Sequence, residues 1–372
     1  MPHVAGDAGA IAWANGVDAT VAGKLDTTVA SSTYARLVER YSGRNLYIYG
    51  NSYAIGTGAS LTSLDFTTLL AAELDMTEIN RAVGGEQTYQ TLNRAMSDPD
   101  STRTLTVPTD AGLFVFCSAI NDVRRDGVVQ AGVLLSTHSL HALIALVSAE
   151  ARIEETAFTF TGAGWSAPVA AGGDYRFSGG FGRYTETLNE YVECAFSGDA
   201  ITNYGFAFPG TTRSLTVEYK VDGVAVRTVN YANDRSPAAT GREWPRFAER
   251  LSGFGPGAHT LRVTKTAGVD AMWVDLMTQP ALNPPPIVIV PPLPLAVYTA
   301  DAPFNNGSDA AVALNVRQLG GIAAAYKNVR VAAVAWNPAT MIAGDTVHPN
   351  DLGHAAISAA VRDAALQLAY VA

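Results

Sequence analysis

The spacing of hydrophobic residues changes twice along this chain of 372 residues, and this change limits the possible folds more than any single motif. From Asn45 to about residue 152, short continuous apolar runs such as LYIYG (Leu46–Gly50) alternate with segments of helical spacing. From about Ile153 to Gln279 the spacing becomes period two, which is typical of strands with one buried face. The alternating pattern then returns. The simplest fold is therefore one α/β domain interrupted by an all-β sandwich.

The α/β segments contain candidate strands at Leu46–Gly50, Met76–Asn80, Leu113–Asp122, Ile287–Val290 and Val329–Trp336. Helices are predicted near 61–74, 130–151, 308–327 and 351–370, with a further one that follows Ser31 and Ser32. Within the β segment, Asp222-Gly223 predicts a tight hairpin. The predicted units are an N-terminal arm (1–43), two parts of the α/β domain (44–152 and 280–372) and the β insertion (153–279).

Charge limits the kinds of partner that the chain can bind. Lys and Arg number 25 against 34 Asp and Glu, which gives a net charge of −9, and charged residues make up only 16% of the chain. Nucleic acids and anionic membranes need a basic face, so we expect neither as a partner. A neutral, hydroxyl-rich glycan suits this surface better.

The two cysteines, Cys117 and Cys194, form no disulfide framework and no metal-ligand spacing, so we expect buried thiols, no metal and no cofactor. The N-terminal residues MPHVAGDAGAIAW lack a basic region before an apolar core, so no signal peptide is visible. No apolar run is long enough for a transmembrane helix. We expect the protein to act outside a cell or on a virion, by a route not encoded in these residues.

Four polar or glycine-rich motifs follow the predicted strands in order. Ser52 comes directly after the first strand, where open α/β sheets bind ligands, although a serine there also caps turns. Asn121 ends the most apolar strand, so its amide can either stabilise an oxyanion or end the strand. Gly84 and Gly85 follow the second strand and either expose backbone N–H groups or form a tight turn.

The fourth motif is GDTVHPN, in which Asp345 precedes His348 by three residues. A catalytic imidazole needs one nitrogen directed at a nucleophile and its other N–H held by an acceptor, commonly a carboxylate. One short Asp-x-x-His loop can supply both groups. The alternative is a turn aspartate beside a surface histidine. The remaining candidates, His138, His141, His259 and His354, are expected to be structural.

The ordered set resembles the SGNH hydrolase superfamily of GDS-type esterases and lipases. Gly50-Asn51-Ser52 matches its first block, Asn80–Gly85 its glycine block, Ala119–Asp122 its Gly-x-Asn-Asp block, and Asp345–Pro349 its final block. The resemblance covers about 44–151 and 284–372, and it implies a three-layer, flavodoxin-like parallel sheet with helices on both faces. Two positions depart from the family, because Asn51 replaces its usual acid and Ala119 its usual glycine.

By this resemblance the reaction is acyl transfer. Ser52 attacks an ester carbonyl, His348 removes its proton, and Asp345 orients the imidazole. The Ser52 and Gly85 backbone N–H groups and the Asn121 amide would form the oxyanion hole. We also expect Asn51 and Asp122 to contact the substrate.

The end of the β insertion, GFGPGAHTLRVTK, resembles the last strands of galactose-binding-like jelly rolls, which are frequently carbohydrate-binding. Exposed aromatic residues stack on sugar rings, but sandwiches bury most of their large aromatics, so at most two are expected to face a ligand. The candidates are Trp165, Tyr175, Phe181, Tyr184 and Trp244, with Trp165, Tyr184 and Trp244 preferred; Arg183, Arg242 and Arg246 either line the same region or are solvated.

The segment Gly16–Ala35 resembles linkers that precede enzymatic domains in phage tail proteins, which are often trimeric; the alternative is an ordinary N-terminal arm. Together these features favour a carbohydrate O-acetyl esterase that acts on an acetylated polysaccharide. The alternative is a glycan-binding or structural tail component whose hydrolase core is impaired, which Asn51 and Ala119 favour.

Overall fold

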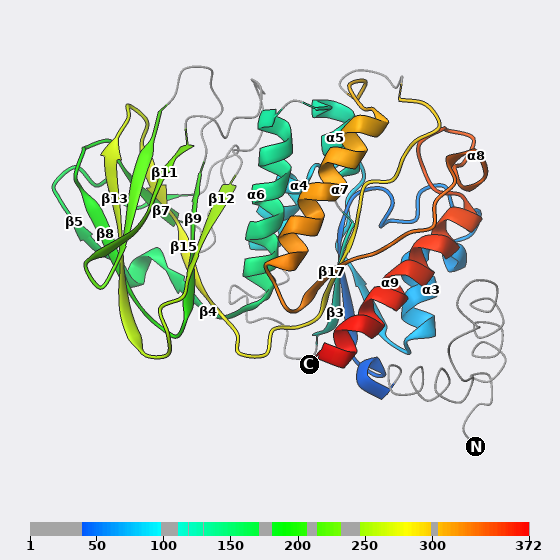
Figure 1. Cartoon of the computed structure of the whole chain (residues 1–372), viewed down its shortest axis with the longest axis horizontal. Coiled ribbons are helices and arrows are strands. Elements are labelled where there is room, and N and C mark those ends of the chain that lie inside the picture. The colour runs from blue at the N-terminus through cyan, green and yellow to red at the C-terminus, as the bar shows by residue number, and fades with distance from the viewer. Residues whose placement is uncertain are drawn as a thin grey trace.

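An α/β half and an all-β half lie side by side along the longest axis of the molecule (Figure 1). The computed structural model describes residues 39–97, 111–117, 119–128, 130–170, 181–206, 214–231, 246–298 and 304–371. The tail-like segment 16–35, most of the predicted arm and the start of the helix expected after Ser31 lie outside these residues, and the end of that helix, residues 39–41, is helical. No helix in the described ranges has the length and apolar character that crossing a membrane requires.

The α/β half is built on a five-stranded parallel sheet. Its strands are β1 (Asn45–Gly50), β2 (Thr77–Asn80), β3 (Ala111–Cys117), β16 (Ile287–Val290) and β17 (Val329–Val331). Their order in the sheet is β2-β1-β3-β16-β17, and every neighbouring pair is parallel. The order 2-1-3-4-5 is that of doubly wound sheets, in which ligands bind beyond the carboxyl ends of the strands. The predicted α/β class with a parallel sheet is therefore confirmed.

Both faces of this sheet are covered by helices, because successive side chains of each strand point to opposite faces. Leu113, Val115 and Cys117 of β3 pack in a cluster with α3 (Phe66–Glu73) and α9 (Asp351–Val371). Phe114 and Phe116 pack in a second cluster with α4 (Thr88–Ser97), α6 (Gln130–Val147) and α7 (Asp309–Ala324). In Figure 1, α6 and α7 lie on one side of the sheet and α3 and α9 on the other. Each fully buried apolar side chain contributes roughly 1.5–3 kcal/mol.

The all-β half begins and ends on two adjacent strands. β4 (Ala149–Glu154) leaves the end of α6, and β15 (Leu276–Pro280) returns antiparallel to it, with Thr278 opposite Arg152. An insertion whose ends lie side by side leaves the α/β sheet intact. β4 spans the boundary that we expected between the α/β domain and the insertion, at 152/153. The helix that we predicted to end at Ala151 ends at Val147, because the residues from Ala149 onward belong to β4.

The insertion consists of antiparallel sheets around its own core. Sheets β11-β10-β13-β8-β5 and β12-β9-β15-β4 enclose a cluster that includes Cys194, Tyr219, Leu261 and Met277, and a smaller sheet has the order β14-β7-β6. Asp222 and Gly223 form the predicted hairpin turn, with φ of 51° and 80°. The remaining strands are β5 (Thr159–Thr161), β6 (Val169–Ala170), β7 (Phe181–Thr185), β8 (Tyr191–Ser197), β9 (Ala200–Phe206), β10 (Thr216–Val221), β11 (Val224–Asn230), β12 (Arg246–Ser252), β13 (Ala258–Ala267) and β14 (Met272–Val274).

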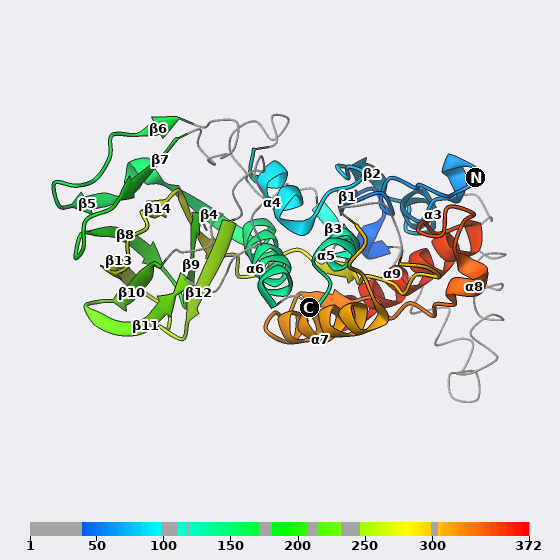
Figure 2. The ribbon, with the colours of Figure 1, turned by 90° about the horizontal axis from the view of Figure 1, so that it is seen from above.

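One face of the insertion packs directly on α6, as the view from above shows (Figure 2). The side chain of Tyr204 is fully buried in the cluster around α6, and its hydroxyl donates to the carbonyl of Ala142, 3.1 Å away. The Arg250 guanidinium lies over the Tyr326 ring at 4.9 Å. The two halves therefore share a hydrophobic core.

Several elements differ from the prediction in length or were not predicted. α4, α5 (Ile120–Asp126), α8 (Pro338–Met341) and the short 3-10 helix Glu155–Ala157 have no counterpart in the sequence-based assignment. The helix expected near 61–74 consists of a 3-10 helix at Thr62–Leu64 followed by α3. The strand expected at 113–122 ends at Cys117, and the strand expected at 329–336 ends at Val331. Cys117 and Cys194 are free and buried as expected, and burial raises the pKa of both thiols.

Candidate active site

Ser52 lies in a turn immediately beyond the carboxyl end of β1. The carbonyl of Ser52 accepts from the N–H of Thr57 at 3.0 Å, and the carbonyl of Asn51 accepts from that of Ala54 at 3.0 Å. Gly50 permits the turn to start against β3, because a Cβ atom at this position would lie 2.3 Å from the carbonyl oxygen of Cys117. The sequence therefore places a serine hydroxyl beyond the carboxyl end of β1, which pairs with the central strand β3.

The structure brings Ser52, His348 and Asp345 into one hydrogen-bonded row. Nε2 of His348 lies 2.8 Å from Oγ of Ser52, and Nδ1 of His348 lies 2.5 Å from Oδ2 of Asp345. A carboxylate only accepts, so Nδ1 carries the proton and Nε2 is the acceptor for the Ser52 hydroxyl. This is the tautomer in which an imidazole can remove the proton of a serine.

Asp345 is held by its own loop. Its Oδ1 accepts from the backbone N–H groups of Val347 at 3.0 Å and His348 at 2.9 Å. Partial burial raises the pKa of this carboxyl, but the two backbone hydrogen bonds and the imidazole outweigh it, so the pKa lies below its ordinary value. The carboxylate therefore stays ionised beside the imidazole, although its side chain is 46% exposed.

Two contacts hold the serine turn against the histidine loop. The hydroxyl of the buried Tyr53 donates to the carbonyl of Val347 at 2.9 Å, and the edge of its ring faces His348 at 6.1 Å between centroids. Gly58 has a φ of +97°, and a Cβ atom there would lie 2.2 Å from the carbonyl oxygen of Pro349. Neither Tyr53 nor Gly58 was predicted to belong to the site, although both lie in the same turn as Ser52, GNSYAIGTG (Gly50–Gly58).

The start of α9 adds a third connection to the serine turn. Nδ1 of His354 accepts from the N–H of Phe66 at 3.3 Å, and Nε2 donates to the carbonyl of Thr57 at 3.3 Å. His354 has no exposed surface, and burial lowers its pKa. The neutral ring is therefore structural, as expected, and it connects α9 both to the turn that carries Ser52 and to the start of α3.

Ser52, Gly85 and Asn121 carry the three N–H groups that we expected to hold an oxyanion, and the N–H of Val83 donates to the carbonyl of Gly50 at 2.9 Å, which brings the segment of Gly85 beside the serine turn. The backbone N–H groups of Ser52 and Gly85 make no hydrogen bond to any residue that the structure describes. Nδ2 of Asn121 donates to the carbonyl of Glu86 at 2.9 Å, and the amide has a second N–H. Ala119, which precedes Asn121 at the start of α5, has the left-handed φ of 73° that a glycine adopts at less cost.

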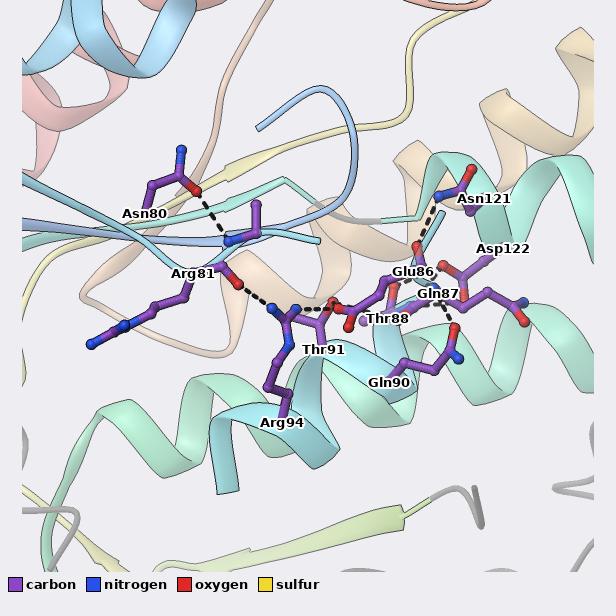
Figure 3. Close-up of polar contacts among 11 residues, drawn as sticks. Asn80, Arg81, Glu86, Gln87, Thr88, Gln90, Thr91, Arg94, Asn121 and Asp122 are labelled. Carbon is purple, nitrogen blue, oxygen red and sulfur yellow. Dashed lines mark hydrogen bonds and ion pairs between the residues drawn. The ribbon is translucent and has the colours of Figure 1, made fainter. Parts of the chain in front are cut away.

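Residues 81–87, here called the glycine loop, are held at both ends by neighbouring side chains (Figure 3). At its start, Oδ1 of Asn80 accepts from the N–H of Ala82 at 3.0 Å. Beyond its end, Oδ2 of Asp122 accepts from the N–H of Thr88 at 3.0 Å and from its hydroxyl at 2.9 Å. Burial raises the pKa of Asp122 to about 7.

Asn51 and Asp122, which we expected to contact a substrate, are both bonded within the fold. They are only 1% and 2% exposed, and their side chains bond to nearby backbone. Oδ1 of Asn51 accepts from the N–H of Tyr53 at 3.1 Å, so Asn51 caps the serine turn, and Asp122 fixes the start of α4. Their role in this structure is to hold the loops that carry Ser52 and Gly85.

The structure does not bring the aromatic candidates of the insertion to the serine. Trp165 donates from Nε1 to the carbonyl of Thr161 at 3.1 Å, and its ring packs on Phe160. The Tyr184 ring lies 4.5 Å from that of Trp273. Both residues belong to the region of β7, which lies at the opposite end of the molecule from α8 in Figures 1 and 2. Trp244, Tyr175 and Arg242 lie outside the described residues.

The described part of the chain contains no group of three or more His, Cys, Asp or Glu side chains placed to hold a metal ion. His141 contacts the hydroxyl of Tyr326 at 3.2 Å, and His259 contacts Asp222 at 2.7 Å.

No protein-family model and no curated protein matches this chain. Solved structures similar to it include a two-domain esterase active on acetylated mannans, co-crystallised with mannopentaose, with 14% identity over 68% of this chain and 95% of that chain and a TM-score of 0.31. CBM35 from Paenibacillus barcinonensis has 18% identity over 35% of this chain and 98% of that chain, with a TM-score of 0.27. The catalytic domain of GH87 alpha-1,3-glucanase in complex with nigerose has 20% identity over 36% of this chain and 28% of that chain, with a TM-score of 0.26. At these TM-scores we base the function below on the geometry of this chain alone.

Proposed function

We propose that this protein is a serine ester hydrolase of the SGNH type. The observation that carries the proposal is the row of hydrogen bonds from Ser52 through His348 to Asp345 at the carboxyl end of a parallel sheet. Alcohol, imidazole and carboxylate in this order form the constellation for acyl transfer.

In the first half of the reaction, Oγ of Ser52 attacks the ester carbonyl and Nε2 of His348 takes the serine proton. Asp345 stabilises the imidazolium that forms. The negative charge that develops on the carbonyl oxygen is held by the N–H groups of Ser52, Gly85 and Asn121. His348 then gives the proton to the leaving alcohol. In the second half, Nε2 of His348 takes a proton from a water molecule that attacks the acyl-serine, and it returns this proton to Oγ of Ser52 as the free acid leaves.

We propose an O-acetylated polysaccharide as the substrate. The catalytic imidazole and carboxylate are 20% and 46% exposed, so the site lies at the surface, where an acetyl group on a bulky polymer can reach Ser52. A net charge of −9 with few charged residues disfavours polyanions, and a β-sandwich packed on α6 offers a second surface for a long glycan. Association with a phage tail, and trimerisation with it, stays a prediction from residues 16–35.

Release of acetate from a panel of acetylated polysaccharides tests the proposal. The full chain is expected to release acetate, and Ser52→Ala to release none above the blank. Ser42→Ala is the matched control, because Ser42 is an exposed serine before the opposite end of β1. Full activity of Ser52→Ala contradicts the mechanism. Glycan binding without turnover by the wild-type chain favours instead the second candidate, a binding or structural protein with an impaired core.

A further inference from the structure

The guanidinium of Arg94, on α4, contacts the glycine loop at both of its ends (Figure 3). It donates to the backbone carbonyl of Arg81 and forms an ion pair with the carboxylate of Glu86. The same carboxylate accepts from the hydroxyl of Thr91 at 3.1 Å, so α4 contributes two donors to it. The side chains of Arg94 and Glu86 are 25% and 14% exposed, which shields their ion pair from solvent better than a surface pair.

Glu86 connects this ion pair to the oxyanion donors. Its backbone carbonyl accepts from Nδ2 of Asn121, and its backbone N–H follows directly on Gly85. A shift of Glu86 therefore moves Gly85 and also changes the direction in which the second N–H of Asn121 points. Two of the three proposed donors thus depend on the position of one residue, whose side chain Arg94 holds.

The chemistry of Arg94 suits this geometry. A guanidinium presents several N–H groups in a fixed plane, so it can donate to Arg81 and Glu86 at once with both contacts fixed relative to each other. A lysine ammonium has the same charge but no such plane. Asp122 fixes the adjoining residue Thr88 and Asn80 fixes Ala82, and Arg94 adds contacts that join Arg81 to Glu86 across the loop.

We propose that Arg94 is a positioning residue that sets the oxyanion hole by holding Arg81 and Glu86 together. This inference rests on the proposed function. Arg94 therefore stabilises the charged tetrahedral state and does not strengthen binding of the uncharged ester, because the oxyanion donors act where charge develops.

Arg94→Lys tests the inference in the full chain with 4-nitrophenyl acetate. We expect kcat to fall about ten-fold or more while KM changes less than about two-fold. The inhibition constant of an alkylboronic acid, whose tetrahedral adduct on Ser52 mimics the oxyanion, is expected to rise by the same factor as kcat falls. Arg262→Lys is the matched control, because Arg262 pairs with Glu193 at 2.7 Å on the insertion, and it is expected to leave all three values unchanged.

A double variant separates positioning from general destabilisation. Arg94→Lys combined with Asn121→Ala is expected to lose less kcat than the product of the two single losses, because both act on the same donors. If the double variant loses kcat by the full product of the two single factors, the two residues act independently and the inference is overturned. Glu86→Gln is the second variant if Arg94→Lys folds poorly; it retains the contact of Arg94 with Arg81 and is expected to lower kcat with KM nearly unchanged.

Amide hydrogen exchange over residues 81–88 gives a readout that needs no turnover. Exchange is expected to be faster in Arg94→Lys than in the wild-type chain and unchanged in Arg262→Lys. Unchanged exchange and unchanged kcat overturn the inference. If exchange is faster in Arg94→Lys but the wild-type protein hydrolyses no ester, Arg94 still holds the loop and the proposed function is overturned instead.

Discussion

Gly58 and Pro349 touch through their backbones, so that a Cβ atom on Gly58 would lie only 2.2 Å from the carbonyl oxygen of Pro349 and 3.0 Å from Cβ of His348. Ser52 and His348 are 296 positions apart in the sequence. At Gly58 the loops that carry them lie so close together that there is no room for a side chain. The reach between the hydroxyl and the imidazole therefore depends on a residue that takes no part in the chemistry.

Gly58→Ala is expected to lower kcat/KM by about a hundred-fold. An ordinary contact for the new Cβ requires the loops to part by more than about 1 Å, and displacements of this size cost catalysis about that factor. Ester hydrolysis and the circular dichroism of the folded chain measure the effect. Gly344→Ala is the control, because no atom lies within 4 Å of its added Cβ although it adjoins Asp345. Equal activity of the two variants contradicts the prediction.

Asn121→Ala is expected to lower kcat by about a hundred-fold or more, since one oxyanion donor contributes on the order of 3 kcal/mol to the barrier. KM should change little, because the donor acts on the charge of the transition state. Steady-state kinetics with a short-chain aryl ester measure both constants. A rise in KM with kcat unchanged would show that Asn121 binds substrate and does not stabilise an oxyanion.

Some parts of this fold follow from local sequence. The continuous apolar run at Leu113–Cys117 predicts a strand buried on both faces, and in the structure its alternate side chains enter two different clusters. The Asp-x-x-His spacing predicts that Asp345 and His348 share one loop, since three residues are enough for the backbone to return the imidazole to the carboxylate.

Other parts depend on contacts between distant segments. α4 was not predicted because its first turn is fixed by Asp122, a side chain from another element. The segment Ala149–Glu154 consists largely of good helix formers, yet pairing with β15 makes it a strand. The burial of Asn51 and Asp122 likewise follows from tertiary packing, which no spacing in the sequence records.

His259 is expected to make the stability of the chain depend on pH. Its Nδ1 lies 2.7 Å from Oδ2 of Asp222 and its Nε2 lies 3.3 Å from the carbonyl of Gly255, so only the doubly protonated ring satisfies both acceptors. The hydrogen bond with Asp222 raises the pKa of His259 above its ordinary value of 6.5. Its contribution is therefore complete below about pH 6.5 and is lost as the pH rises through the pKa of the folded state.

Denaturant unfolding of the wild-type chain and of His259→Gln at pH 5.5, 7 and 8.5 measures this contribution. The difference in unfolding free energy between the two is expected to be largest at pH 5.5 and to shrink toward pH 8.5. Asp222→Asn should behave in the same way. A difference that stays constant with pH would mean that the pKa of His259 is the same in the folded and unfolded states, which contradicts the prediction.

Tyr204 is expected to couple the two halves of the molecule. Its ring is fully buried in the cluster around α6, so Tyr204→Ala should destabilise the protein by about 3–5 kcal/mol. Tyr204→Phe removes only the hydroxyl, with its contacts to the Ala142 carbonyl and the Thr278 hydroxyl, and should cost about 1 kcal/mol. Because the cluster belongs to both halves, Tyr204→Ala should also lower the temperature at which the proposed esterase activity is lost. Tyr219→Ala is the comparison, since Tyr219 is buried in the core of the insertion alone and should affect this temperature less. Equal inactivation temperatures for Tyr204→Ala and the wild-type chain would show that the halves unfold independently, in which case the shared cluster orients the insertion without stabilising the site.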